Sequence, residues 1–389
     1  MMAVPDAATS ATKRDWAPFV HQQADLAALA ERNRVRGLRP QRGRDFSSND
    51  YLGLAGSARL GAAVGAALAR GVAIGSGGSR LLRGNHPEHE ALEQQAAAFF
   101  GSEAALFFAS GFAANSALLA TLPQRGDLIV HDALVHASAR EGMRLARCEA
   151  VAVLHNDVQA FDEVIARWRR KGGVGTAWIA VESLYSMDGD RAPLAALAEI
   201  ADRRGAVLLI DEAHATGIFG PDGRGLAAGL EGRANVVTLR TCGKALGCEG
   251  ALVCGPKVAC DFLVNRGRGF IFSTAPSPLM ACAVSEALRA LADEPDRRCK
   301  LAGLVKEAER LLVPLGAHAT ATPILPLMLQ TEARALRVAG VLQAQSFDVR
   351  AIRPPTVPDG TSRLRISLTL NVDVADVEAL AGALKEALQ

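Results

Sequence analysis

Three residues near the middle of the chain carry groups that suit one kind of chemistry. Asp211 and His214 follow an apolar run at 206–210, and Lys244 follows a strand-like run at 236–240. Pyridoxal phosphate needs a lysine for its Schiff base, a carboxylate that keeps its ring nitrogen protonated, and a flat group against its ring. Taken singly, the lysine could be a solvated loop residue, the aspartate a helix N-cap and the histidine a structural residue. Together, at strand ends where ligands of doubly wound sheets bind, they predict a pyridoxal phosphate site.

A seat for a phosphate is predicted at Ser110-Gly111-Phe112. These residues follow the strand-like run 104–108 and begin an apolar helix, so free backbone amides lie at a helix N-terminus, where anions bind. An ordinary helix start has the same appearance. The glycine-rich run 75–80 does not lie between a strand and a helix of a βαβ unit, so it does not predict a nicotinamide site.

Two further polar residues follow predicted strands. His136 comes after the run 128–131, and Ser186 comes after the run 177–182. Loops after parallel strands share one edge of a sheet, so both residues are expected beside the lysine. A histidine can stack on a ring or transfer a proton, and a serine can bond a phenolate oxygen or a phosphate.

A pair of arginines near the C-terminus lies in a strand pattern. Arg363 and Arg365 alternate with apolar residues, so they share one face of a strand at 363–370. Such arginines are commonly solvated edge charges. Arg365 is the better candidate for a carboxylate clamp, because a guanidinium binds a carboxylate through two parallel hydrogen bonds.

The elements that position these residues alternate along the chain. Between about 51 and 290, amphipathic helical stretches separate seven strand-like runs, which predict a mostly parallel sheet with helices on both faces. The runs are 104–108, 128–131, 150–154, 177–182, 206–211, 236–240 and 251–254. Helical spacing at 17–36 predicts an N-terminal helix, followed by a basic connector.

After about residue 291 the pattern changes to that of a smaller α+β unit. A long charged helix, a strand at 323–329, a helix from 332, strands at 348–352 and 363–370 and a terminal helix are expected. The predicted organisation is a segment with helix and connector at 1–50, a large cofactor-binding domain at 51–290 and a small domain at 291–389.

Composition narrows the classes of function. Across 389 residues, 43 basic and 41 acidic residues give a net charge of +2, which provides no broad electrostatic attraction to nucleic acid or membranes. The seven cysteines lack the paired spacing of a metal site, so reduced thiols and no metal are expected. Residues 1–16 lack the apolar core of a secretory signal, and no run is long enough to span a membrane, so we expect a cytoplasmic protein.

With these residues in place, the chain resembles the α-oxoamine synthase family of pyridoxal-phosphate enzymes, which join an amino acid to an acyl thioester with loss of carbon dioxide. The resemblance runs from about residue 46 to the end. Its motifs are 46–54, 75–80, 110–115, 185–190, 211–217, 241–244 and 270–276. It implies an aspartate-aminotransferase-like fold (pyridoxal phosphate fold type I), an acyltransferase, and a homodimer with active sites at the interface.

The resemblance also implies roles for residues around the cofactor ring. Lys244 forms the Schiff base, Asp211 pairs with the pyridinium nitrogen and His136 stacks on the ring. Ser186 and His214 contact the side of the ring that carries the phenolic oxygen.

The remaining implied roles concern the phosphate and the substrates. Gly111, Phe112 and Thr241 help seat the phosphate, and Ser273 or Thr274 contacts the phosphate in the neighbouring subunit. The residues implied to bind the amino-acid carboxylate and the acyl substrate are Asn49, Thr356 and Arg365.

Within the family, the run 351–365 is most similar to that of members that condense L-alanine with a pimeloyl thioester in biotin biosynthesis. The alternatives are a sibling that uses glycine or serine with another acyl-CoA, and a noncatalytic partner subunit. The acyl carrier, coenzyme A or acyl carrier protein, stays open.

The chain departs from the family pattern in three places. Val372 stands where a histidine is usual, and Glu249 with Cys248 lies in a loop usually filled by small residues. A shortened stretch before residue 46 leaves three choices for the substrate arginine. These are Arg32, Arg34 and Arg36.

Overall fold

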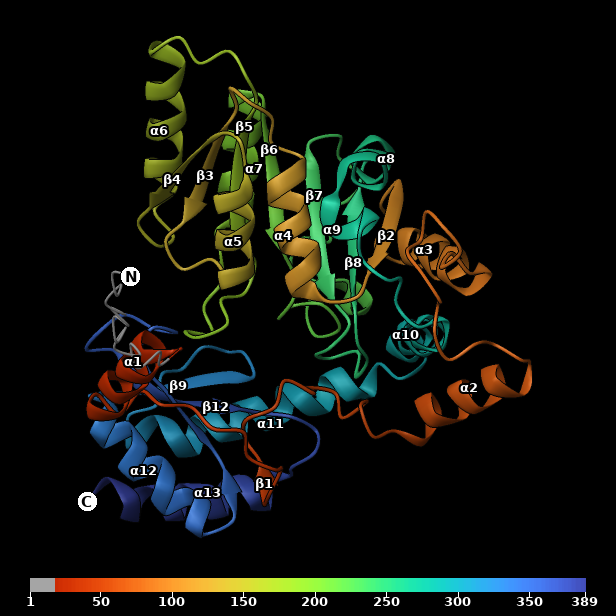
Figure 1. Ribbon diagram of the computed structural model, residues 1–389. Coiled ribbons are helices and arrows are strands. Elements are labelled where there is room, and N and C mark those ends of the chain that lie inside the picture. The colour runs from red at the N-terminus through yellow and green to blue at the C-terminus, as the bar shows by residue number, and fades with distance from the viewer. Residues whose placement is uncertain (1–17) are drawn as a thin grey trace, which may run out of the picture.

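A seven-stranded sheet forms the centre of the larger part of the molecule (Figure 1). The computed structural model describes residues 18–389, and the expectations for residues 1–16 lie outside them. The strand order is β2-β8-β7-β6-β5-β3-β4. Strand β8 runs antiparallel to both of its neighbours, and the other six strands all run in one direction. The strands are β2 (Ala104–Phe108), β3 (Leu128–Asp132), β4 (Glu149–Val153), β5 (Ala177–Glu182), β6 (Ala206–Asp211), β7 (Val236–Thr241) and β8 (Ala251–Gly255). All seven predicted strands are confirmed, as is the mostly parallel sheet.

Helices cover both faces of this sheet (Figure 1). Alternate residues of β3 show why: Ile129 packs with α4 and α5 on one face, whereas Val130 packs with α6 and α7 on the other. Strands buried on both faces read as nearly continuous apolar runs, which made them visible in the sequence. The helices of this part are α2 (Ala58–Ala69), α3 (Pro87–Phe100), α4 (Gly111–Thr121), α5 (Ala137–Leu145), α6 (Val158–Arg170), α7 (Leu194–Arg204), α8 (Lys257–Arg266), α9 (Arg268–Ile271) and α10 (Pro278–Asp293).

The smaller part has an antiparallel sheet in the order β11-β12-β9 and a short parallel pair, β1 with β10. Its strands are β1 (Arg44–Asp45), β9 (Ile324–Gln330), β10 (Phe347–Asp348), β11 (Arg350–Ile352) and β12 (Ser362–Ser367). Its helices are α1 (Val20–Glu31), α11 (Asp296–Leu312), α12 (Glu332–Ala344) and α13 (Val374–Leu388).

The predicted N-terminal helix and the C-terminal order of elements are confirmed, with two differences in the strands. The strand expected at 348–352 is two strands, β10 and β11, separated by Val349. Strand β12 ends at Ser367 rather than continuing to residue 370. Leu368 still donates to the Pro323 carbonyl, but Pro323 has no amide to return the bond, and Leu370 donates to Tyr51 instead. The change from α10 to α11 at residues 293–296 supports our proposal of a domain boundary near 291.

Within residues 18–389, no helix is both long and apolar enough to cross a membrane.

Candidate active site

A cavity of about 140 Å³ lies at the carboxyl ends of the central strands, beside the N-terminus of α4. The structure brings seven of the predicted site residues to its wall: Gly111, Phe112, His136, Asp211, His214, Thr241 and Lys244. They come from four segments, at or just beyond the ends of β2, β3, β6 and β7. The gathering follows from the sheet, since parallel strands deliver the residues that follow them to one edge.

Lys244 and Asp211 face this cavity from adjacent strands. Asp211 is the last residue of β6, and Lys244 lies three residues beyond β7. Asp211 accepts hydrogen bonds from Asn115 Nδ2 (2.6 Å) and from the backbone amide of Ala213 (2.9 Å), which fix its carboxylate. Burial lowers the pKa of Lys244, although the negative charges of Asp211 and Glu182 oppose the shift. The lysine is therefore easier to deprotonate than a solvated one.

His136 is the N-cap of α5, and its Nδ1 accepts a hydrogen bond from the Ser138 amide (3.2 Å). The Ser138 hydroxyl lies 2.7 Å from the same nitrogen. Burial lowers the pKa of His136. The positive charge of Lys244 lowers it further, whereas the negative charge of Asp211 opposes the shift. A neutral ring held at one nitrogen is suited to lie flat against an aromatic ligand.

His214 lies 2.7 Å, Nδ1 to hydroxyl oxygen, from Tyr51 in the interior. Burial lowers the pKa of His214 well below its usual value, and the positive charges of Lys244 and Arg365 add to the shift. The imidazole is therefore neutral, and it can exchange hydrogen bonds at either nitrogen.

Arg365 is buried, and its guanidinium donates a hydrogen bond to the Ser367 hydroxyl (2.6 Å). It donates to Asn49 Oδ1 (3.0 Å), to the Ser186 carbonyl (2.5 Å) and to the Tyr51 hydroxyl (3.3 Å). Its neighbour Arg363 is also buried and pairs with Asp188. The interpretation of these arginines as solvated edge charges is therefore wrong, and their shared face is confirmed. A guanidinium held by Asn49 is positioned to receive a carboxylate.

The N-terminus of α4 lines one end of the cavity with Gly111 and Phe112. The Ser110 hydroxyl caps the helix by accepting from the Ala113 amide (3.1 Å). A Cβ at Gly111 would lie 3.3 Å from Thr241 Oγ1, so a side chain there would crowd the opening. The glycine keeps backbone amides accessible to an anion.

Five predicted residues do not line this cavity. Two of them, Asn49 and Arg365, bond each other as described above. The Ser186 side chain does not line it, and Ser186 meets Arg365 through its backbone carbonyl. Thr274 lies exposed on the loop before α10. Thr356 accepts from Arg36 Nη2 (2.9 Å) at a separate cavity of about 760 Å³ between the N-terminal segment and β11.

Four residues at the site were not singled out from the sequence: Tyr51, Asn115, Ser138 and Glu182. Burial raises the pKa of Glu182 well above its usual value, and the negative charge of Asp211 adds to this. Its Oε1 is buried without a hydrogen-bond partner in the described part of the chain. One signal was available for Asn115, because it lies one helical turn after Gly111 and so on the same face of α4.

The donor set fits pyridoxal phosphate. A lysine of lowered pKa, a carboxylate held by two donors, a neutral histidine and a capped helix N-terminus surround one cavity. Each group meets a separate need of the cofactor. In the same order, these needs are an amine for the Schiff base, a partner for the pyridine nitrogen, a contact for the ring and a seat for the phosphate.

Comparison with known proteins supports this assignment. A curated 8-amino-7-oxononanoate synthase from Anaeromyxobacter dehalogenans is 45% identical over 347 residues, covering 88% of this chain and 86% of the relative. The solved 8-amino-7-oxononanoate synthase of Francisella tularensis has a TM-score of 0.75 at 26% identity, covering 89% of this chain and 98% of that one. A lysine-to-alanine variant of serine palmitoyltransferase from S. paucimobilis, solved with a bound aldimine of pyridoxal phosphate and myriocin, has a TM-score of 0.86 at 25% identity and covers 95% and 97%.

These neighbours confirm the aspartate-aminotransferase-like fold. The model of the family described as aminotransferase class I and II matches residues 43–384, nearly the whole length. The chain therefore belongs to the class I and II aminotransferase family.

Proposed function

We propose that the chain catalyses the decarboxylative condensation of L-alanine with a pimeloyl thioester to give 8-amino-7-oxononanoate, carbon dioxide and the free thiol. The observation that carries this proposal is the meeting of two sites. The cofactor cavity around Lys244 adjoins the Arg365 and Asn49 pair, through the contact of Arg365 and His214 with the Tyr51 hydroxyl. The identity with curated 8-amino-7-oxononanoate synthases supports the choice of substrates.

The cofactor end of the site requires four residues of this chain. Pyridoxal phosphate supplies, when bound, an electron sink for bonds broken at the amino-acid Cα. Lys244 would hold it covalently, and Asp211 would hold the proton on its ring nitrogen. His136 would cover the ring face, and the amides at Gly111 would bind the phosphate.

The amino-acid end depends on Arg365. Its guanidinium, oriented by Asn49, binds the carboxylate of alanine and so directs the Cα hydrogen toward Lys244. Lys244 Nζ then takes that proton, because its lowered pKa increases the fraction of unprotonated amine that can act as a base. His136 and His214 are neutral, so each can give or accept a proton as the acyl group is attacked and the thiol leaves.

The acyl chain meets the enzyme near Thr356. Of the three candidate arginines, Arg36 is the one that bonds Thr356, whereas Arg34 pairs with Glu332 and Asp359. We therefore propose Arg36 as the substrate arginine. Both coenzyme A and acyl carrier protein present the same pantetheine arm, so the pimeloyl thioester of either carrier fits this proposal.

We also propose a homodimer with active sites at the interface. The loops 74–82 and 272–277 are tied together by Ser277 Oγ to the Ile74 carbonyl (2.5 Å) and by the Ala275 amide to the Gly78 carbonyl (2.9 Å). This ordered surface exposes Ile74 (75%), Leu82 (85%) and Phe272 (73%), and Phe112 at the cavity is 51% exposed. Apolar side chains clustered in this way favour burial against a second copy, to which Thr274 would contribute its phosphate contact.

The thiols support the compartment predicted from the sequence. All seven cysteines are free, and burial raises the pKa of Cys254 and Cys260 to about 12. Protonated, unpaired thiols suit a reducing environment, so we propose that the protein is cytoplasmic.

The substrates are tested by offering purified protein L-alanine, glycine and L-serine in parallel, with pyridoxal phosphate and pimeloyl-CoA. The expected result is condensation product by mass spectrometry, together with thiol release, from L-alanine alone. A preference for glycine or serine would assign the chain to a sibling activity. A protein that takes up no pyridoxal phosphate would instead be a noncatalytic partner subunit.

A further inference from the structure

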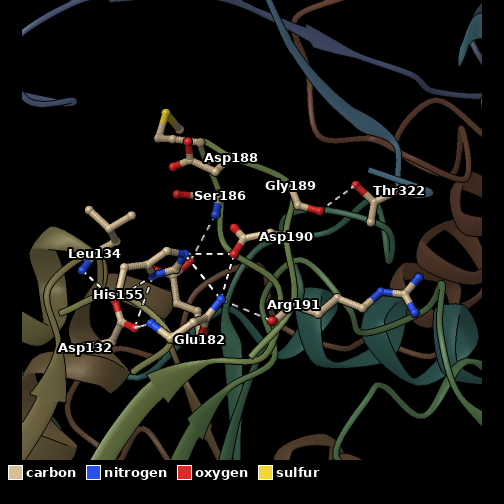
Figure 2. A network of polar contacts seen from close by, with 12 residues as sticks. Asp132, Leu134, His155, Glu182, Ser186, Asp188, Gly189, Asp190, Arg191 and Thr322 are labelled. Atoms are coloured by element: carbon tan, nitrogen blue, oxygen red, sulfur yellow. Dashed lines mark hydrogen bonds and ion pairs between the residues drawn. The ribbon is translucent and has the colours of Figure 1, made fainter. Parts of the chain in front are cut away.

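An ionic bridge lies beside the active site, where strands β3, β4 and β5 end (Figure 2). His155 Nδ1 lies 2.9 Å from Asp132 Oδ1, and its Nε2 lies 2.7 Å from Asp190 Oδ2. Asn156 adds to the connection by donating its backbone amide to Asp132 (2.7 Å) and its side-chain amide to Asp190 (2.7 Å). We call Asp132, His155 and Asp190 the histidine bridge.

The bridge is charged. Burial alone would lower the pKa of His155, but the hydrogen bonds and charges of Asp132 and Asp190 raise it to about 10. Both ring nitrogens therefore donate at neutral pH. Asp132 is fully buried, and the ring of His155 meets that of Tyr185 edge to face at 4.4 Å. The geometry of the imidazolium is thus fixed on three sides, unlike that of a solvated surface pair.

The bridge holds a loop that spans the two parts of the molecule. The loop, residues 183–191, contains Asp190 and closes on itself through the Tyr185 amide to the Asp190 carbonyl (2.9 Å). Its Ser186 amide donates to Glu182 Oε2 (3.2 Å) on the large sheet. Its Gly189 carbonyl accepts from Thr322 Oγ1 (3.2 Å) of the smaller part (Figure 2).

The same loop contacts both arginines of β12. The Ser186 carbonyl accepts from Arg365 Nε (2.5 Å), and Asp188 pairs with Arg363. Arg365 therefore has one hydrogen bond to a loop whose own position is set by His155, a residue outside the loop. A displacement of the loop would move the Ser186 carbonyl, which is one of the acceptors that orient the Arg365 guanidinium.

We propose that the histidine bridge is a positioning device for the amino-acid substrate: by fixing residues 183–191, it holds Arg365 where it meets the substrate carboxylate. This rests on the proposed function, in which Arg365 binds that carboxylate. None of the three bridge residues lines the cofactor cavity, so the absorption of the bound cofactor is a readout separate from alanine binding.

The experiment compares His155→Gln and Asp190→Ala with the wild-type holoenzyme. Asp162→Ala is the matched control, because Asp162 also accepts from two side chains, Arg203 and Arg204, but lies on α6 and does not line the cavity. The dissociation constant for L-alanine is measured from the change that it causes in the visible absorption of the cofactor. Hydrogen exchange of residues 183–191 and 362–367 is measured on the same proteins without substrate.

We expect His155→Gln and Asp190→Ala to weaken alanine binding by roughly tenfold, since small displacements of positioning groups are costly. Their cofactor absorption stays as in the wild type, both segments exchange faster, and Asp162→Ala changes nothing. Alanine affinity within twofold of wild type, or an equal loss in Asp162→Ala, would overturn the proposal. If alanine causes no change in absorption even in the wild type, the proposed function fails. Hydrogen exchange then tests the histidine bridge alone: exchange of residues 183–191 and 362–367 that is unchanged in the variants would refute its positioning role.

Discussion

Two effects set the pKa values of the basic groups at the active-site edge of the large sheet. Burial lowers each pKa, and neighbouring carboxylates raise those of Lys244 and His155. Burial lowers the pKa of the Lys244 amine and of the His214 imidazole, so it favours the unprotonated form of both. His155 is equally close to the sheet edge, yet two carboxylates overcome burial and keep it charged by raising its pKa. One sheet edge therefore holds two groups whose burial favours the uncharged form and one cation that its carboxylate partners keep charged.

The charge on His155 predicts how stability varies with pH. Its pKa is raised from about 6.5 in the unfolded chain to about 10, so folding favours the protonated form. The resulting stabilisation is fully present below about pH 6.5 and is lost as the pH rises through 10. The Tm advantage of wild type over His155→Gln is therefore expected to shrink steadily across that range in thermal unfolding followed by circular dichroism. A constant advantage from pH 6.5 to 10 would be incompatible with a protonated bridge.

At the scale of elements, most strands of the large sheet were predictable because they are buried on both faces. The exception is β4 at the edge of the sheet, where three of the five residues are exposed. The runs 104–108, 177–182 and 206–211 match β2, β5 and β6 from end to end. The polar residues that follow such runs are also visible in the sequence, which is why its pattern alone assigns Asp211, His136 and Lys244 to one edge of the sheet.

The partners that complete the site could not be predicted, because they are fixed by packing between distant segments. Asn115 reaches Asp211 across 96 residues, and Tyr51 reaches His214 across 163. Nothing in the local pattern of either segment specifies its partner. The burial of Arg363 and Arg365 was equally hidden, because it depends on the loop 183–191 packing over β12.

The capped N-terminus of α4 predicts a combined effect on stability and cofactor affinity. Ser110→Ala removes the hydroxyl that accepts from Ala113, which should cost about 1 kcal/mol of unfolding free energy in urea titrations. Because the same helix end forms the phosphate seat, the affinity for pyridoxal phosphate should fall as well.

Asp157→Ala is the matched control, since Asp157 caps α6 in the same way through the Ala160 amide but lies away from the cavity. It should lose similar stability with unchanged cofactor affinity. Equal losses of affinity in both variants would show that the N-terminus of α4 has no special role.

At the scale of the whole molecule, the active site depends on two parts of the chain. The large sheet supplies the cavity around Lys244, and β12 of the smaller part supplies Arg365. The exposed apolar side chains near the cavity support our proposal of a third contribution, from a second copy of the chain.

The proposed dimer is tested by placing charges on that surface. Leu82→Glu combined with Phe272→Glu should convert a dimer to a monomer in sedimentation experiments, because burying unpaired carboxylates at an interface is costly. Val174→Glu, at a residue that is 93% exposed on the loop between α6 and β5, should leave the dimer intact. A double variant that sediments as the wild type does would place the interface elsewhere.

The most direct test of the proposed reaction uses L-alanine labelled in its carboxyl carbon, with pimeloyl-CoA and the holoenzyme. We expect one labelled carbon dioxide for each thiol released by the wild type, and none from Lys244→Ala. Thiol release without labelled carbon dioxide would mean that the enzyme only hydrolyses the thioester. Equal carbon dioxide release from Lys244→Ala would contradict the role given to this lysine.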